Sequence, residues 1–175
     1  MKRIVIVGTS CTGKTTLSKT LERKLGIPAQ DIDELHWLPD WKHVTTEELE
    51  VKVSDFIKAD SWSLTGNYSS VRALIWERVD TVIWLNYPLP FVLLQALKRS
   101  LKRIFTIELV CNGNRETFIQ TFFTRDSILW WIIKSHGRNL ERYREAQKNS
   151  KYSKIKILEF YDRYELQNWL DSLSC

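Results

Sequence analysis

The stretch that decides the fold is Gly8-Thr9-Ser10-Cys11-Thr12-Gly13-Lys14-Thr15-Thr16, which has the spacing G-x-x-x-x-G-K-[ST] of a phosphate-binding loop. The β-branched run before it, residues 3–7, is typical of a buried parallel strand. Residues 14–25 place leucines at steps of four, and Gly26 and Pro28 then end the predicted helix. A strand, a glycine-bracketed loop and a helix are the context that this motif requires.

Each residue type in the loop has a local physical reason. Gly8 and Gly13 let the backbone bend around phosphates without a Cβ in the way. The N–H groups from Gly8 to Thr16, including that of Cys11, are expected to face the anion. Lys14 is expected to reach the β- and γ-phosphates, and the Thr15 hydroxyl to bind Mg²⁺. The loop therefore predicts ATP and Mg²⁺ as cofactors.

Size and composition favour one α/β domain. The chain has 175 residues, enough for a single core, and a net charge of +5 that suits anionic ligands. It runs from Met1 straight into the first strand, and no apolar run approaches the length of a membrane span. We therefore expect a cytoplasmic protein without a membrane partner. Cys11, Cys111 and Cys175 are widely spaced, which predicts neither a disulfide framework nor a zinc site.

The rest of the chain alternates strand and helix signals, as a parallel α/β sheet requires. Further strands are predicted at residues 27–32, 61–65, 80–85 and 155–160. Helices are predicted at residues 46–59, at a short segment capped by Ser69 or Ser70, at 89–105, at 117–144 with a break near Gly137, and after Asp162. In the helix over 89–105 the predicted buried side carries Phe91, Leu94, Leu97 or Lys98, Leu101 and Phe105, and residues 128–133 are expected to be core.

Acidic residues follow the second predicted strand. In an open parallel sheet the ligand crevice lies at the carboxyl ends of the strands, so Asp31 and Asp33 are expected beside the phosphate loop. One would orient Mg²⁺ through water, and the other would accept a proton from a substrate hydroxyl. The alternative, that they are turn residues or a helix N-cap, stays open. Asn86 ends the strand at 80–85 where a Walker B carboxylate often stands, which shifts metal binding towards Asp31, Asp33 or water.

An aromatic segment and a basic region complete the set of candidates. Trp37 and Trp41, with His36 as a polar contact, either form a stacking wall for a planar substrate or cover the edge of the core. Residues 98–151 hold 12 Lys and Arg against 5 Asp and Glu. They form either a solvated basic face or arginines that close over a phosphoryl group. Nucleic acid is a second candidate partner, although no nucleic-acid-binding motif is visible.

Taken together, these residues resemble the adenylate-kinase-like P-loop phosphotransferases, and within them the small bacterial proteins often labelled DNA topology modulation proteins. The resemblance covers nearly the whole chain. It rests on the phosphate loop, Asp31-Ile32-Asp33 with Leu35-His36-Trp37 and Trp41, Trp62 through Gly66-Asn67-Tyr68, Val82 to Leu85 with Pro88, and Asn112-Gly113-Asn114-Arg115-Glu116. Two departures are Thr65, where adenylate kinases usually have Asp before Gly, and Asn86.

The resemblance implies a P-loop three-layer αβα fold around five parallel strands, a substrate-side segment at residues 33–70 and a lid at residues 104–118. It implies that Arg99 and Arg103 lie at the lid hinge, that Arg115 is the lid arginine, and that Arg138 or Arg142 comes from the following helix.

The leading hypothesis is an ATP- and Mg²⁺-dependent kinase of a small acceptor such as a nucleoside or nucleotide. A sugar- or shikimate-type acceptor stays open as a further alternative. The predicted catalytic residues of the kinase are Lys14, Asp33, Arg99, Arg103 and Arg115. The predicted acceptor-binding residues are Asp31, Asp33, His36, Trp37, Asn67 and Arg72. A nucleotide-dependent regulator that binds nucleic acid is the alternative, and a switch GTPase is disfavoured because no N-K-x-D sequence is present.

Overall fold

A five-stranded parallel sheet forms the centre of the computed structural model, which describes residues 1–106, 109–115 and 127–173. The strand order is β2-β3-β1-β4-β7, and each strand runs parallel to its neighbours. The strands are β1 (Arg3–Gly8), β2 (Ala29–Asp31), β3 (Trp62–Thr65), β4 (Thr81–Leu85) and β7 (Lys156–Phe160). The predicted α/β fold with five parallel strands is confirmed, although β2 is shorter than predicted.

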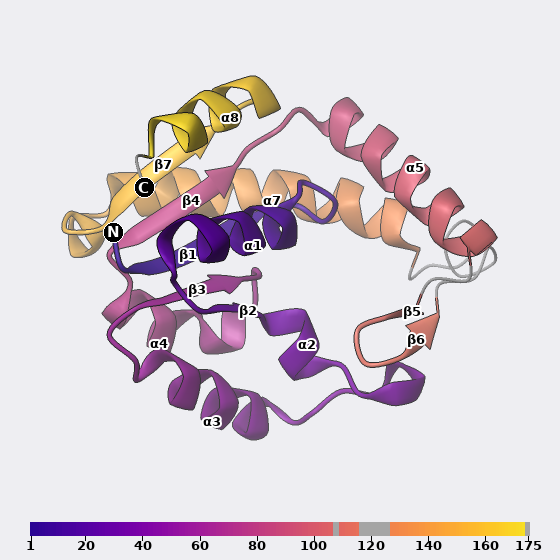
Figure 1. Ribbon diagram of the computed structural model, residues 1–175, viewed down its shortest axis with the longest axis horizontal. Coiled ribbons are helices and arrows are strands. Elements are labelled where there is room, and N and C mark those ends of the chain that lie inside the picture. Colours follow the sequence, from indigo (N-terminus) through magenta and orange to yellow (C-terminus); the bar gives the residue numbers. More distant parts are fainter. Residues whose placement is uncertain (107–108, 116–126, 174–175) are drawn as a thin grey trace.

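Helices pack on both sides of this sheet (Figure 1). They are α1 (Lys14–Leu25), α2 (Ile32–His36), α3 (Thr46–Ile57), α4 (Ser69–Arg78), α5 (Leu89–Thr106), α7 (Ile128–Lys148) and α8 (Arg163–Ser172). Two short 3₁₀ turns are η1 (Pro39–Trp41) and η2 (Ser150–Tyr152), and β5 (Leu109–Val110) pairs antiparallel with β6 (Asn114–Arg115). Within the described ranges no helix is long and apolar enough to span a membrane.

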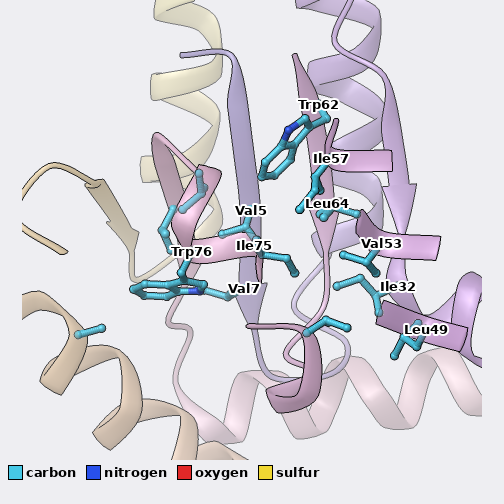
Figure 2. Close-up of a cluster of buried hydrophobic side chains, with 14 of the residues drawn as sticks. Val5, Val7, Ile32, Leu49, Val53, Ile57, Trp62, Leu64, Ile75 and Trp76 are labelled. Carbon is cyan, nitrogen blue, oxygen red and sulfur yellow. The ribbon is translucent and has the colours of Figure 1, made fainter. Parts of the chain in front are cut away.

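The alternation of side chains along β1 divides the core into two layers. Val5 and Val7 join the cluster formed with α3 and α4, which Figure 2 shows around Trp62 and Leu64. Ile4 and Ile6 join the cluster formed with α1, α5 and α8. Helix α7 contributes to both layers, so it is packed against both parts of the core.

Several predicted helix ends are confirmed by their capping geometry. Gly26 has a φ of 64° and donates its N–H to the carbonyl of Glu22, which ends α1. Asp162 accepts the N–H of Glu165 at the start of α8. The predicted serine cap of α4 is wrong, because Tyr68 occupies the N-cap position and no side chain caps that helix.

Helix α7 also differs from its prediction. It passes Gly137 without a break, because its inward face continues from Ile132 through Asn139 to Tyr143. Residues 117–126 of the predicted helix lie outside the described residues. The run 128–133 is core only in part, since Ile132 is fully buried while Trp130 and Trp131 are 46% and 53% exposed.

The buried side of α5 was predicted only in part, since Phe91 packs against the core as expected but other positions do not. Val92, Ala96 and Ser100 are buried, whereas Leu94 is 49% and Phe105 82% exposed. The small residues permit close packing of α5, and the helix is rotated so that Leu94 and Phe105 face outwards. Among the residues predicted as a lid, 104–106 belong to α5 and 109–115 form the β5–β6 hairpin.

Candidate active site

The phosphate loop joins β1 to α1 at the carboxyl edge of the sheet. Gly8 has a φ of 147°, and a Cβ added there would lie 2.7 Å from the carbonyl oxygen of Leu85. Gly13 has a φ of 93° and occupies the N-cap position of α1. Both glycines of the motif are therefore required by the backbone, as predicted from their spacing.

Lys14 is folded back onto the loop that precedes it. Its Nζ donates to the carbonyl oxygens of Gly8 and Thr9, each at 3.1 Å. Burial lowers the pKa of Lys14, while the carboxylates of Asp33 and Asp31 oppose this shift. A lysine cation at the N-terminal end of a helix, beside the N–H groups of such a loop, agrees with a phosphate ligand.

Asp31 connects the phosphate loop to the acidic segment after β2. Its Oδ2 accepts the hydroxyl of Thr15 at 2.6 Å, and its Oδ1 accepts the N–H of Asp33 at 3.1 Å. Asp31 is thus the N-cap of α2, as the alternative reading predicted, and also a hydrogen-bond partner of the loop. The fold brings together the start of α1 and the end of β2, which are 16 residues apart in sequence.

The Thr15–Asp31 pair offers the oxygen ligands that Mg²⁺ prefers. This ion is commonly held by one or two protein oxygens together with phosphate oxygens and water. No group of three His, Cys, Asp or Glu side chains within the described ranges could hold a metal. The pair fits Mg²⁺ bound with a nucleotide better than it fits an all-protein metal site.

Asp33 lies in α2 close to the loop lysine. Its pKa is raised, with burial as the largest cause and the Asp31 carboxylate next. The hydroxyl of Tyr68 donates to its Oδ1 at 2.7 Å and, together with Lys14, opposes that rise. A carboxyl whose pKa is raised near a phosphate loop can accept a proton from a hydroxyl group. The Tyr68 contact was not predicted, although Tyr68 lies in the singled-out Gly66-Asn67-Tyr68 stretch.

Asn67 holds the first residue of the phosphate loop. Its Nδ2 donates to the carbonyl of Gly8, and its Oδ1 accepts the N–H of Gly8 at 3.3 Å. Its Oδ1 also accepts the hydroxyl of Tyr143 on α7 at 2.7 Å. Asn67 was predicted to bind the acceptor; in the structure its amide bonds the backbone of Gly8 and the hydroxyl of Tyr143.

The aromatic segment lies beside Asp33 through its contact with Tyr68. The rings of His36 and His43 stack with centroids 5.4 Å apart, and His36 lies 4.9 Å from the ring of Tyr68. Trp37 meets Trp41 edge-on at 5.6 Å, and both indoles are half-buried. Burial and the neighbouring His43 lower the pKa of His36. These rings pack against one another next to the predicted acceptor carboxylate.

The N-G-N stretch of the β5–β6 hairpin is fastened to the same segment. Asn112 Nδ2 donates to the carbonyls of Glu34 and Trp37 at 2.9 and 2.6 Å. Asn114 Nδ2 donates to the carbonyl of Leu38 at 2.9 Å, and its Oδ1 accepts the N–H of Trp41 at 2.7 Å. None of these four bonds could be predicted from the sequence, because each joins positions more than seventy residues apart.

The turn of this hairpin lies close to the acidic pair. The pKa of the Cys111 thiol is raised to about 11, mainly by burial and then by the charges of Asp33 and Asp31. Arg103 opposes that shift, and Arg99 helps to lower the pKa of Lys14. Both arginines of α5 therefore lie within electrostatic reach of the site, as their predicted role requires.

The other arginines that the sequence analysis singled out lie on three different elements, α4, α7 and β6. Arg72 lines a small hollow with Asn67, Tyr68 and Tyr143. Arg138 of α7 lies over the ring of Trp131, 5.6 Å from its centroid. The backbone of Arg115 belongs to β6, and its side chain lies outside the described part of the chain.

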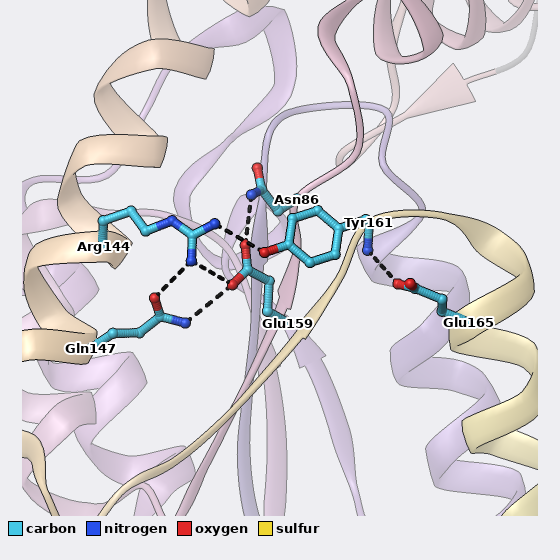
Figure 3. Close-up of polar contacts among 6 residues, drawn as sticks. All are labelled: Asn86, Arg144, Gln147, Glu159, Tyr161 and Glu165. Carbon is cyan, nitrogen blue, oxygen red and sulfur yellow. Dashed lines mark hydrogen bonds and ion pairs between the residues drawn. The ribbon is translucent and has the colours of Figure 1, made fainter.

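Asn86 joins a polar network between β7 and α7 (Figure 3). Its Nδ2 donates to Glu159 Oε1 at 2.7 Å, and the other oxygen of Glu159 accepts from Arg144 at 2.8 Å and from Gln147 at 3.2 Å. Arg144 also donates to the hydroxyl of Tyr161. The amide after β4 thus helps to join β4, β7 and α7.

Comparison with known proteins supports the fold. No protein-family model and no curated protein matches the chain significantly. Among solved structures, shikimate kinase from Acinetobacter baumannii in complex with shikimate is 16% identical, with a TM-score of 0.60 and coverage of 99% of this chain and 96% of that one. Shikimate kinase from Bacteroides thetaiotaomicron is 16% identical, with a TM-score of 0.57 and coverage of 98% and 96%.

A gluconokinase from Sinorhizobium meliloti 1021 is similar at 12% identity, with a TM-score of 0.51 and coverage of 90% of this chain and 81% of that one. At these identities the likeness concerns the arrangement of strands and helices. The chain therefore has the α/β fold found in these small P-loop kinases.

Proposed function

We propose that this protein is an ATP- and Mg²⁺-dependent kinase that transfers the γ-phosphoryl group to a hydroxyl of a small molecule. The observation that carries the proposal is the 2.6 Å bond from Thr15 to Asp31, which unites the phosphate loop with the Asp31–Asp33 segment. A phosphate site and a base for a hydroxyl are the two parts that such a transfer needs in one place.

The proposed roles follow from position and charge. Lys14 and the loop N–H groups bind the phosphates, and Thr15 with Asp31 holds Mg²⁺, which neutralises phosphate charge when it is bound. Asp33 aligns the acceptor hydroxyl and accepts its proton. Arg99 and Arg103 stabilise the charge that spreads over the transferring group, and Arg115 is proposed to join them from the hairpin.

We propose residues 33–70 as the acceptor side of the site and residues 104–118 as its lid. The bonds of Asn112 and Asn114 to residues 34–41 support this division, because they fasten the hairpin to the acceptor side. His36, Trp37 and Arg72 are proposed to contact the acceptor. A nucleoside- or nucleotide-like acceptor agrees with the adenylate-kinase-like resemblance, and a sugar- or shikimate-type acceptor agrees with the names of the solved relatives. A kinase that uses ATP is expected in the cytoplasm.

A phosphorylation screen with labelled ATP tests the proposal. Purified protein is offered nucleosides, nucleotides, sugars and shikimate-type hydroxy acids, with Lys14→Ala and Asp33→Asn proteins as parallel samples. We expect saturable labelling of one acceptor class, loss of ATP binding in Lys14→Ala, and retained ATP binding without transfer in Asp33→Asn. The proposal is lost if ATP with Mg²⁺ does not bind, or if Lys14→Ala leaves binding intact.

One observation favours a second function, that of a nucleic-acid-associated regulator. Trp130 and Trp131 are exposed on α7, with Lys134 and Arg138 lying over their rings at 5.2 and 5.6 Å. Aromatic rings with nearby cations are a common surface for single-stranded nucleic acid. Salt-dependent binding of single-stranded DNA that disappears in the Lys134→Gln, Arg138→Gln double variant would favour this function. Saturable phosphorylation of one metabolite would exclude it as the main function.

A further inference from the structure

Helix α7 holds the phosphate loop at two points. Nδ1 of His136 lies 3.2 Å from the hydroxyl oxygen of Thr9, the second residue of the loop. Two turns further along, Tyr143 donates to Asn67, which bonds both backbone groups of Gly8. One face of a single helix therefore supports the first two residues of the loop, one directly and one through an amide.

Thr9 connects this support to the loop lysine. Its carbonyl oxygen accepts Nζ of Lys14 at 3.1 Å and the hydroxyl of Thr12 at 2.9 Å. The residue is only 4% exposed, so its side chain and its carbonyl have little room to move independently. Thr9 therefore contacts His136 through its hydroxyl and Lys14 through its carbonyl oxygen.

We propose that His136 is a positioning residue of the phosphate loop that takes up a proton from solvent when a nucleotide triphosphate binds. The inference rests on the proposed function, because it requires the triphosphate to occupy the loop. His136 was not among the residues that the sequence pointed to, since a single histidine in a long basic helix carries no motif.

The chemistry follows from the donors and acceptors of an imidazole ring. A neutral ring protonated at Nε2 accepts the hydroxyl proton of Thr9 at Nδ1. An imidazolium carries N–H on both nitrogens, so its Nδ1 must donate to the oxygen of Thr9. The Thr9 hydroxyl keeps its proton and can then donate it in a hydrogen bond to another acceptor, such as an oxygen of a phosphate bound in the loop. The added positive charge also favours the bound anion.

The ring is poised for this change when the loop has no nucleotide. Burial lowers the pKa of His136 below the ordinary value of 6.5, so the free protein carries it neutral at pH 7. Burial is the cause of that shift. The charged groups of the surrounding elements are Lys14 of the loop, Asp31, Asp33, Arg99 of α5 and Arg138 of α7. A bound triphosphate would raise the pKa of His136, because a nearby anion stabilises the imidazolium.

The sign of the pH dependence follows from this linkage. Between the pKa of the free protein and the higher pKa of the complex, nucleotide binding takes up close to one proton. Affinity then falls by up to about tenfold for each unit of rising pH inside that window. Below the pKa of the free protein the ring is already charged, and the dependence vanishes.

Histidine NMR on the wild-type chain tests the inference without a mutation at the site. The chain has three histidines, and His43→Asn and His136→Asn spectra assign their signals. We expect the pKa of His136 to rise by at least about one unit when MgCl₂ and a non-hydrolysable ATP analogue are added. Binding of the analogue with no change at His136 would overturn this inference alone. No binding at all would overturn the proposed function, and the inference with it.

Affinities for the same analogue between pH 6 and pH 8 give a second test. Dividing the wild-type affinity by that of His136→Asn cancels protonation of the nucleotide itself. We expect this ratio to fall as the pH rises, whereas Tyr143→Phe weakens binding by the same factor at every pH, because burial raises the pKa of Tyr143 to about 12. A ratio for His136→Asn that stays constant across this range would refute proton uptake by His136.

Discussion

Replacing Tyr68 with Phe tests how the site sets the proton affinity of Asp33. The substitution removes one hydroxyl, which donates to Asp33 Oδ1 at 2.7 Å, and leaves the ring that contacts His36. This bond stabilises the carboxylate and so opposes the rise in the pKa of Asp33 that burial causes. Its removal is therefore expected to raise that pKa further.

The size of the shift follows from the strength of the bond. A hydrogen bond to a charged group contributes about 1.5–3 kcal/mol, and one pKa unit corresponds to about 1.36 kcal/mol. Complete loss of the bond would thus raise the pKa of Asp33 by about one to two units, and a water that replaced the hydroxyl would reduce the effect. A smaller fraction of Asp33 would then be ionised at neutral pH, and the acidic limb of kcat/KM would move to higher pH.

Carbon-13 NMR of labelled aspartate carboxyls measures this pKa whether or not the acceptor is known. Tyr164→Phe is a matched control, because Tyr164 is 75% exposed on α8. We expect the Asp33 signal to titrate at higher pH in Tyr68→Phe and at the wild-type position in Tyr164→Phe. An unchanged or lower pKa of Asp33 in Tyr68→Phe would refute the reasoning.

Three further predictions concern stability. Because the pKa of Asp33 is raised in the fold, its ionised form costs stability above that pKa, and the cost disappears as the pH falls through it. Asp33→Asn should therefore raise Tm at pH 8 but progressively less towards pH 4. A difference in Tm between variant and wild type that is the same at every pH would contradict this. Asn114→Ala removes a 3% exposed amide that joins the hairpin to residues 38–41. Hydrogen exchange of the backbone amides in the hairpin and in residues 38–41 should accelerate by the equivalent of about 1–3 kcal/mol, as measured by mass spectrometry. Unchanged exchange would show that the Asn114 bonds are dispensable. Glu159→Gln weakens the pairing with Arg144 and should lower the free energy of unfolding by about 1–2 kcal/mol in urea titrations. The control Asp55→Asn breaks the exposed pair with Lys58 and should change that free energy by less than about 0.5 kcal/mol. Equal effects of the two variants would argue that the Glu159–Arg144 network does not stabilise the fold.

Much of the fold could be predicted because its signals are local. The phosphate loop depends on glycine conformations and on a lysine and a threonine at fixed spacing, and each of these acts within a few residues. The strands at residues 3–7 and 80–85 are apolar runs that only a doubly covered sheet can bury, which made the parallel arrangement predictable. The rotation of α5 was not predictable in this way, since Leu94 and Ala96 are both apolar and only packing decides which one is buried.

In the site, too, the residues linked by local signals were predictable and the contacts between distant elements were not. Lys14, Thr15 and the acidic pair were identified from the sequence because a motif and the ends of parallel strands place them together. The bonds of Tyr68 to Asp33, of Tyr143 to Asn67 and of His136 to Thr9 were not, since each joins side chains distant in sequence. The same holds for the asparagines of the hairpin, which bind backbone groups that any residue could supply.

The sequence alone therefore determined that this chain has a phosphate loop at the edge of a parallel sheet, because backbone conformation and hydrophobic periodicity are encoded residue by residue. Tertiary structure alone decided which side chains hold that loop and tune its charges. Hydrogen bonds and desolvation depend on distances between elements, and those distances exist only once α7, the hairpin and the sheet have packed together.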